Sequence, residues 1–111
     1  MTQKNFITEG KVASQGSLEG KVRLLSNEGE DDPVFFEDKI LVVEYTSPEH
    51  YPYIINSRGV ITEMGGLLSH AAIITRELNK PSIVGAVGIR EYLRDNDYIT
   101  VEEHGRIYKV S

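Results

Sequence analysis

The chain has 111 residues and no cysteine, and 12 lysine and arginine residues stand against 17 aspartate and glutamate residues, a formal charge of −5. This length suits one domain with its own core, and the lack of cysteine excludes disulfides, thiolate metal sites and cysteine nucleophiles. No stretch is apolar enough for a bilayer or a signal peptide, and net acidity without a basic cluster argues against nucleic acid, so we expect a cytoplasmic domain that binds neither membrane nor nucleic acid.

The first third of the chain is rich in turn residues. We expect residues 1–9, which are polar, to form a flexible N-terminus ahead of a single domain over residues 10–111. Short runs at 11–14 and 21–26 alternate apolar and polar residues, as half-buried strands do. The acidic segment 27–33 could hold a cation, but its composition is more typical of a solvated loop.

Continuous apolar runs mark the buried strands. The runs 39–45 and 59–62 have strand length and no alternation, which is typical of strands that are buried on both faces, and 82–85 is predicted as a further short strand. Between them, 48–56 and 89–94 are predicted as short helical segments, the first because a proline follows a capping serine.

The principal helix is predicted at about 69–79. Ser69 is a good N-cap, Asn79 can adopt the left-handed conformation that ends a helix, and Pro81 prevents continuation. The chain then closes with a hairpin across His104-Gly105. Strands outnumber helices, so the fold class is α/β with one principal helix.

The most informative segment joins a buried strand to this helix. The strand ends at Thr62, the pair Gly65-Gly66 follows, and the capped helix begins at Ser69-His70. Glycines leave backbone N–H groups accessible, and a helix N-terminus carries partial positive charge. Both features favour an anion, phosphate in particular.

His70 stands where such an anion would bind. A histidine is mostly neutral at pH 7, because its ordinary pKa is about 6.5, and one ring nitrogen can then attack a phosphoryl group. A Ser69–His70 nucleophile–base pair is excluded, because adjacent helical residues do not face each other. Metal ligation is disfavoured because Ile73 and Ile74 occupy the positions one turn away. The residues alone leave open phosphate chemistry, general-base catalysis and a surface histidine at a helix start.

The other histidines and the paired acidic residues are weaker candidates for a functional site. His50 and His104 lie in turn-rich segments, and we expect both to face solvent. Glu102-Glu103 does not suit a catalytic pair, because neighbours in a strand point to opposite faces.

The segment TEMGGLLSHAAIITRELNKPSIVG (62–85) closely resembles the phosphohistidine motif of the PEP-utilising enzymes, among them phosphoenolpyruvate synthase, pyruvate phosphate dikinase, rifampin phosphotransferase and Enzyme I. Segments 10–23, 38–54 and 93–110 also resemble that family. Thr75 and Asn79 depart from its usual alanine and glycine.

The resemblance implies the mobile, swivelling domain of these enzymes, a β/β/α sandwich that carries a phosphoryl group on histidine. His70 would be the phosphorylated nucleophile, and Thr62 would form a hydrogen bond near the ring or the phosphate. The implied phosphate-binding residues are Gly65, Gly66, Ser69 and Arg76, although a structural ion pair is an equal alternative for Arg76.

In that family the other reaction steps belong to separate domains. The resemblance implies an ATP-grasp-like nucleotide-binding partner and a PEP- or pyruvate-binding partner, which would supply ATP or PEP and magnesium, while this chain would bind no cofactor or metal itself. It would then be a phosphotransferase component, either a stand-alone carrier with a complete small reading frame or a domain of a longer protein. The alternatives are a non-catalytic interaction or regulatory module with the same fold and a sensor of small anions.

Overall fold

The computed structural model describes residues 2–26 and 31–111. Within them, the strands are β1 (Lys4–Glu9), β2 (Lys11–Ser14), β3 (Glu19–Leu25), β4 (Ile40–Val43), β5 (Gly59–Thr62), β6 (Ser82–Val84), β7 (Tyr98–Glu102) and β8 (Arg106–Val110). The helices are α1 (Tyr51–Asn56), α2 (His70–Glu77) and α3 (Ile89–Tyr92), with short 3-10 turns at Pro33–Phe36, Pro48–His50 and Glu103–Gly105. None of the helices in this described part is long and apolar enough to cross a membrane.

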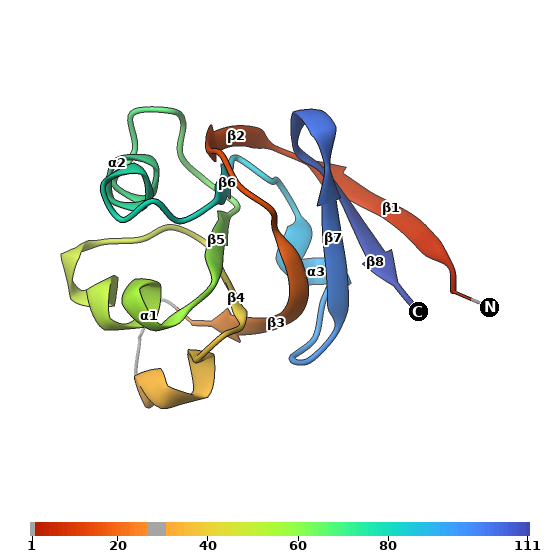
Figure 1. Cartoon of the computed structure of the whole chain (residues 1–111), viewed down its shortest axis with the longest axis horizontal. Helices are drawn as coiled ribbons and strands as arrows, with labels where there is room; N and C mark the ends of the chain where they lie inside the picture. The colour runs from red at the N-terminus through yellow and green to blue at the C-terminus, as the bar shows by residue number, and fades with distance from the viewer. Residues whose placement is uncertain (1, 27–30) are drawn as a thin grey trace.

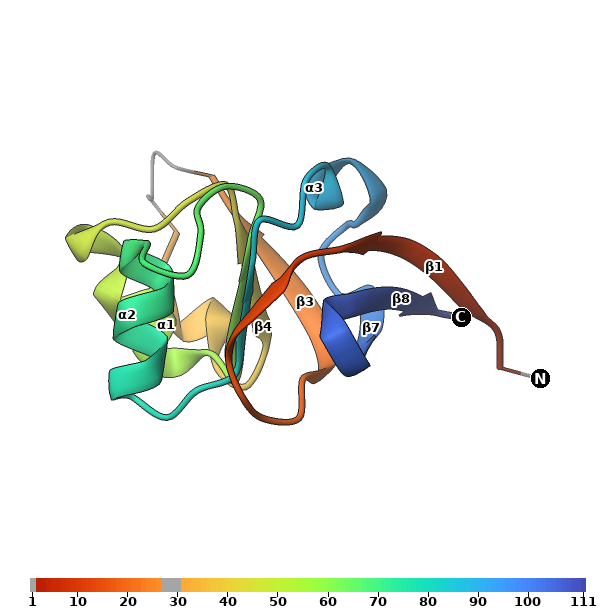
Figure 2. The same ribbon diagram turned by 90° about the horizontal axis from the view of Figure 1, so that it is seen from above.

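The strands form two layers that share β3. They follow the order β1-β8-β7-β3-β4-β5-β6-β2, in which β3 to β6 run parallel and the outer pairings are antiparallel. Residues 19–21 of β3 pair with β7, whereas residues 22–25 pair with β4, so this strand passes from one layer into the other. Helices α1 and α2 cover one face of the parallel strands, and β1, β7 and β8 cover the opposite face (Figures 1 and 2). This α/β arrangement confirms the predicted fold class.

The central strands are buried on both faces, as their unbroken apolar runs predicted. In β4, Ile40 and Val42 belong to the core between the two β layers, whereas Leu41 and Val43 belong to the core under α1. This division follows from the strand period of two residues. Helix α2 instead packs through Ala71 and Ala72 against the edge formed by β2 and β6, where small side chains let helix and sheet approach closely.

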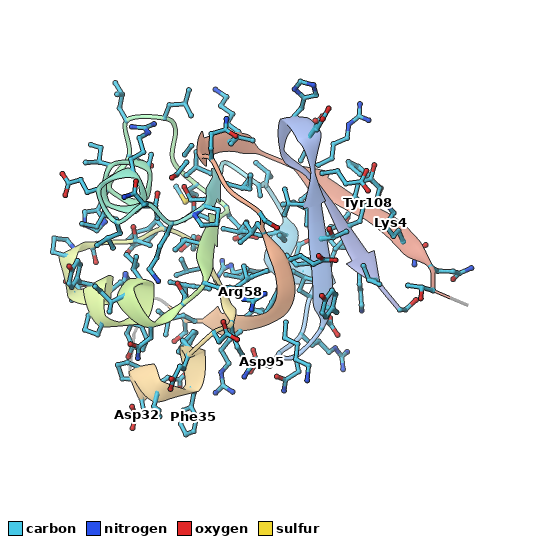
Figure 3. The ribbon with its side chains drawn as sticks, viewed as in Figure 1. Lys4, Asp32, Phe35, Arg58, Asp95 and Tyr108 are labelled. Carbon is cyan, nitrogen blue, oxygen red and sulfur yellow. The ribbon has the colours of Figure 1, made fainter. Side chains whose placement is uncertain are left out.

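The N-terminal residues differ from the sequence expectation. Residues 1–9 were expected to be flexible, yet β1 pairs antiparallel with β8 along its length. The Phe6 and Tyr108 rings meet edge to face with centroids 5.7 Å apart, and the Lys4 ammonium lies 5.2 Å from the Tyr108 ring centroid (Figure 3). The polar composition of residues 1–9 does not indicate flexibility here, because an edge strand of an outer layer is solvated on one face and along one edge and can therefore be polar.

A close backbone approach joins the two layers where β1 gives way to β2. The N–H of Gly10 donates to the Gly105 carbonyl at 3.0 Å. Gly105 has a φ of +82°, and a Cβ on it would lie 2.2 Å from the Gly10 carbonyl oxygen. Only glycine fits at this crossing, which explains why the terminal hairpin turns at His104-Gly105.

The predicted helix and hairpin are confirmed. Ser69 caps α2, and Asn79 follows its C-terminal end with a φ of +55°, as expected of a residue that closes a helix. Thr75, which replaces the usual alanine, is buried; its hydroxyl donates to the Ala71 carbonyl at 2.7 Å and hydrogen-bonds the Ser82 hydroxyl at 2.7 Å. Of the acidic segment 27–33, residues 27–30 lie outside the described residues, so its prediction stays a prediction.

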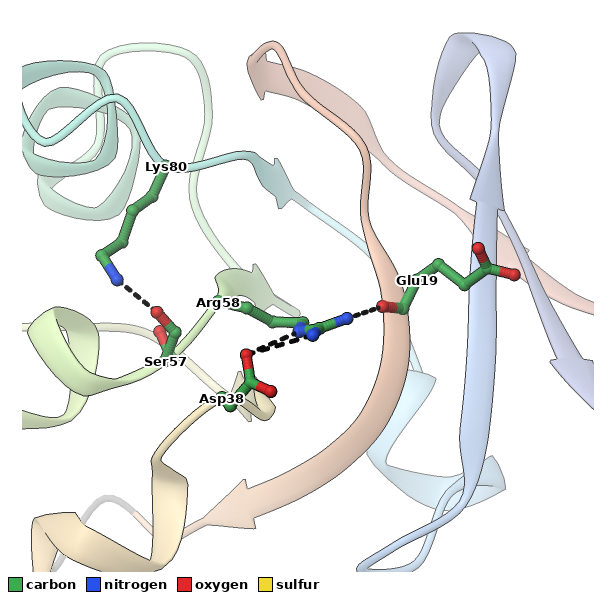
Figure 4. Close-up of polar contacts among 5 residues, drawn as sticks. All are labelled: Glu19, Asp38, Ser57, Arg58 and Lys80. Atoms are coloured by element: carbon green, nitrogen blue, oxygen red, sulfur yellow. Dashed lines mark hydrogen bonds and ion pairs between the residues drawn. The ribbon is translucent and has the colours of Figure 1, made fainter.

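Side-chain clamps hold the edge of the sheet at which the parallel strands begin. Arg58 donates through Nη1 to the Glu19 carbonyl at 2.5 Å and through Nη2 to Asp38 at 3.0 Å (Figure 4). The Lys80 ammonium donates to the carbonyl oxygen of Ser57 at the end of α1. These contacts join β3, α1 and the start of β6 at one edge of the sheet.

Candidate functional site

The site lies at the opposite edge, where the parallel strands end. Two backbone hydrogen bonds bring the loops after β4, β5 and β6 together: Met64 N–H donates to the Glu44 carbonyl, and Ala86 N–H donates to the Thr62 carbonyl, both at 2.9 Å. The carboxyl ends of parallel strands are where α/β sheets bind ligands. The loop after β5 continues directly into α2, so it connects this edge to the start of the helix.

The predicted glycine pair forms the turn of that loop. Gly65 has a φ of +103°, and a Cβ on it would lie 3.0 Å from the Ser69 Cβ. A Cβ on Gly66 would have nothing within 4 Å, and the Gly66 carbonyl accepts the Ser69 N–H at 3.0 Å. Gly65 is therefore required by conformation, whereas Gly66 leaves the backbone accessible beside the helix start.

Helix α2 begins at His70. The Ser69 hydroxyl oxygen accepts the N–H of Ala72 at 3.4 Å, as an N-cap does. The remaining N–H groups of the first turn carry the positive end of the helix dipole. Of the predicted site residues, Gly65, Gly66, Ser69 and His70 thus lie together in one turn and helix start.

Thr46, which the sequence analysis did not single out, contacts His70 directly. Its hydroxyl oxygen lies 2.9 Å from Nδ1 of the His70 ring, and only 8% of the residue is exposed. The hydrogen bond fixes the orientation of the ring and leaves Nε2 as the nitrogen without this contact. A neutral imidazole with its proton on Nδ1 donates to Thr46 and keeps an electron pair on Nε2.

A signal for Thr46 was present in the sequence. Thr46 directly follows the continuous apolar run 39–45 and precedes Ser47-Pro48. His70 lies in the segment that follows the next continuous apolar run, 59–62. Because the carboxyl ends of parallel strands share one edge of a sheet, two such loops are brought side by side.

Thr62 holds the glycine loop in this structure. It is completely buried, and its hydroxyl donates to the Met64 carbonyl at 2.7 Å. That bond spans the residues leading into Gly65. The predicted contact of Thr62 with the ring or a phosphate stays a prediction.

Arg76 ties the same loop to the edge of the sheet. Its guanidinium donates through Nε to the Ala13 carbonyl at 2.8 Å and through Nη2 to the Leu67 carbonyl at 2.5 Å. These partners are backbone carbonyls of β2 and of the loop before α2. Its phosphate-binding role also stays a prediction.

A family model describes much of the chain. The model for "PEP-utilising enzyme, mobile domain" matches residues 35–104, more than half of the sequence and all of the site. The chain belongs to this family. The resemblance stated from the glycine loop and His70 is thereby confirmed.

Curated relatives of this mobile domain are much longer proteins. It is 33% identical over 109 residues to a probable phosphoenolpyruvate synthase of Methanothermobacter thermautotrophicus, covering 97% of this chain and 16% of that protein. It is 36% identical over 96 residues to the rifampicin phosphotransferase of Bacillus subtilis, covering 86% of this chain and 11% of that protein. The chain thus spans about one sixth or less of the length of these relatives.

A solved structure has the same type of fold. A solution structure of an Enzyme I protein superposes with a TM-score of 0.55 at 24% identity, covering 66% of this chain and 31% of that chain. The likeness supports the α/β arrangement described for this mobile domain.

The other two histidines of the mobile domain, His50 and His104, differ in solvent exposure. His50 was expected to face solvent, but it is 1% exposed: its Nδ1 accepts the N–H of Ser47 at 3.1 Å and its ring lies beside that of Tyr53. The expectation was wrong because the turn Pro48–His50 folds the ring back to cap its own start. His104 is exposed, as predicted.

Among the described residues, no group of three or more histidine, aspartate or glutamate side chains is placed to hold a metal ion. Glu102 ends β7 and its carboxylate pairs with Lys4, whereas Glu103 begins the following turn. The groups that the structure brings together at the site are the His70 ring, the Thr46 hydroxyl and the backbone of the glycine loop.

Proposed function

We propose that this mobile domain is a phosphoryl carrier and that Nε2 of His70 is the atom that is phosphorylated. The observation that carries the proposal is the 2.9 Å contact between Thr46 Oγ1 and His70 Nδ1 at the N-terminus of α2. It directs the other ring nitrogen away from Thr46 at a place suited to an anion. Family membership supports the same role.

In the proposed step, the electron pair of Nε2 attacks the phosphorus of the donor. The bond from phosphorus to the leaving oxygen breaks, and the leaving group, a nucleoside diphosphate or the enolate of pyruvate, keeps the electron pair. The ring then carries a positive charge, with its proton on Nδ1 hydrogen-bonded to Thr46. Transfer to an acceptor oxygen reverses the step and restores the neutral ring.

The backbone favours the phosphorylated form. The first turn of α2 and the accessible backbone at Gly66 offer N–H groups and positive potential to the phosphoryl oxygens. Ser69, Thr62 and Arg76 support this arrangement through the helix cap and the loop carbonyls. Direct contacts of these three side chains with the phosphoryl group are part of the proposal.

The donor and acceptor sites belong to partner domains or proteins. We propose that one partner binds nucleotide and another binds PEP or pyruvate, each supplying its own magnesium to neutralise the phosphates during transfer. Exposed apolar side chains precede the nucleophile: Leu67 is 45% exposed and Leu68 is 86% exposed. Such side chains suit transient docking against a partner.

Intact-mass analysis tests the proposal. The chain would be incubated with extract of its source, supplied separately with PEP and with ATP, beside the His70→Gln variant. The expected result is a single phosphoryl group that is acid-labile and base-stable and that His70→Gln lacks. The donor that labels the chain identifies the donor side.

Either of two results would contradict the proposal. One is an adduct that persists in His70→Gln, because the phosphorylated residue would then be another. The other is no adduct with either donor in an extract that phosphorylates a known carrier, which would favour an interaction module. Reversible phosphate binding without a covalent adduct would instead indicate a sensor of small anions.

A further inference from the structure

Arg90 in α3 joins two of the loops that form the site. Its Nε donates to Glu63 Oε1 at 2.7 Å, and its own backbone N–H donates to Glu63 Oε2 at 3.1 Å. Its Nη2 lies 3.6 Å from Glu44 Oε2. One guanidinium therefore pairs with two carboxylates, one from the loop after β4 and one from the loop after β5.

The two carboxylates belong to the segments that position His70. Glu44 lies two residues before Thr46, which holds Nδ1 of the ring. Glu63 lies two residues before Gly65, where the loop to α2 turns. The backbone of the two segments is also joined, because Met64 N–H donates to the Glu44 carbonyl. Arg90 thus fixes the loop that bears Thr46 relative to the loop that leads to His70.

Arg90 also neutralises the negative charge of Glu63. The Glu63 side chain is only 14% exposed, so without Arg90 a largely buried carboxylate would lack its cationic partner. That negative charge would lie in the loop that is proposed to face a phosphoryl group. The Arg90 side chain is 33% exposed, and its positive charge offsets the repulsion between the Glu63 carboxylate and a phosphoryl group. The ion pair also holds the Glu63 side chain in one position.

We propose that Arg90 is a positioning residue for His70: it holds the loops after β4 and β5 in register so that Thr46 keeps the imidazole proton on Nδ1. The effect on phosphoryl transfer rests on the proposed function, whereas the effect on the ring does not. Arg90 acts through Glu44 and Glu63, and Arg90→Gln removes its charge and its fork of donors.

The first test measures the ring directly. ¹⁵N chemical shifts of the His70 imidazole in the whole chain distinguish a proton on Nδ1 from one on Nε2. We expect Nδ1–H in the unmodified chain and a shift toward Nε2–H in Arg90→Gln. Arg58→Gln is the matched control, since Arg58 also bonds one carboxylate and one other element, but at the opposite edge of the sheet. It should leave the ring unchanged.

The second test measures transfer. With a donor that labels the chain, the single-turnover rate of Arg90→Gln should fall about tenfold to a hundredfold, because small misplacement of a reacting group costs that much. The concentration of donor protein at half-maximal rate should change less than twofold, since Arg90 is not proposed to touch the partner. Arg58→Gln should keep both values.

The results separate the two proposals. An unmodified chain that is never phosphorylated contradicts the carrier function, while the ring measurement still tests Arg90. A folded Arg90→Gln with the unmodified ring state and transfer rate overturns the role of Arg90. If Arg90→Gln does not fold, Glu63→Gln, which keeps the shape of the side chain, provides the same two measurements with the same expected directions.

Discussion

Thr46 and His70 are 24 residues apart in sequence, and a hydrogen bond of 2.9 Å joins the Thr46 hydroxyl to the His70 ring. An imidazole without a partner on Nδ1 exchanges its proton between two nitrogens, and only one of the two forms has an electron pair on Nε2. The Thr46 hydroxyl can accept the Nδ1 proton of that form, and it can keep this bond when the ring becomes positively charged. The proposed carrier function therefore uses this contact in both the free and the phosphorylated state.

Replacing Thr46 by valine tests this contact with little change in shape. We expect single-turnover phosphorylation of His70 to slow by about tenfold to a hundredfold, since a hydrogen bond to a charged group contributes about 1.5–3 kcal/mol. Rapid-quench measurement of the phosphorylated chain gives the rate. Thr46→Ser, which keeps the hydroxyl, should retain most of it. Equal rates for the valine and serine variants would contradict the role of the hydroxyl.

At the scale of elements, the loop between β5 and α2 has a rigid part and an exposed part. Thr62, Arg76 and the Ser69 cap fix its backbone, whereas Leu67 and Leu68 extend into solvent. A leucine that is 86% exposed contributes almost nothing to folding. Its placement directly before the cap of α2 suits the docking role that is proposed for it.

We predict that Leu68→Asp weakens docking without affecting the fold. The concentration of donor protein at half-maximal rate should rise about tenfold, which corresponds to about 1.4 kcal/mol of lost contact, while the stability changes by less than about 0.5 kcal/mol. Transfer assays at varied donor concentration, together with urea titration, measure the two effects. Val34→Asp is the control: Val34 is 52% exposed beside Phe35, which lies away from α2 (Figure 3). A similar loss in both variants would contradict a local docking surface.

The elements were predicted unevenly, for physical reasons. Helix α2 was found because Ser69 and Asn79 mark its ends locally, and β4 because a continuous apolar run suits a strand buried on both faces. The edge strand β1 was missed because half of its surroundings are solvent. His50 was placed wrongly because its burial depends on a turn that returns to Ser47. Thr46 was missed because its contact with His70 exists only once the sheet has formed.

At the scale of the whole molecule, the helix that begins at His70 and the chain ends are separated. The Lys4 end of β1 and the Val110 end of β8 lie together, and α2 lies at the other end of the longest axis, which measures 40 Å (Figures 1 and 2). Hydrogen bonds between Gln3 and Ser111 hold the terminal strands together. The two β layers thus lie between the chain ends and α2 (Figures 1 and 2).

The pH dependence of the free energy of unfolding tests how the protein packs around Tyr53. Burial, followed by the charges of Asp31 and Asp32, raises the pKa of Tyr53 above its ordinary value of 10.0. Because the unfolded chain then loses this proton first, the contribution of Tyr53 to stability is complete below pH 10 and decreases as the pH rises further.

Tyr53→Phe removes both the ionisation and the hydrogen bond that the hydroxyl donates to the Asp31 carbonyl. At neutral pH the variant should be less stable by about 1 kcal/mol, the usual value of one such bond. Above pH 10 the difference between the two proteins should shrink, because only the unmodified chain loses stability through the ionisation of Tyr53. Urea titrations of both proteins at neutral pH and at several values above pH 10 give the difference directly. Tyr53 is 5% exposed and belongs to the core cluster under α1, and a gap that stays constant or widens with rising pH would show that its hydroxyl is not held in this buried environment.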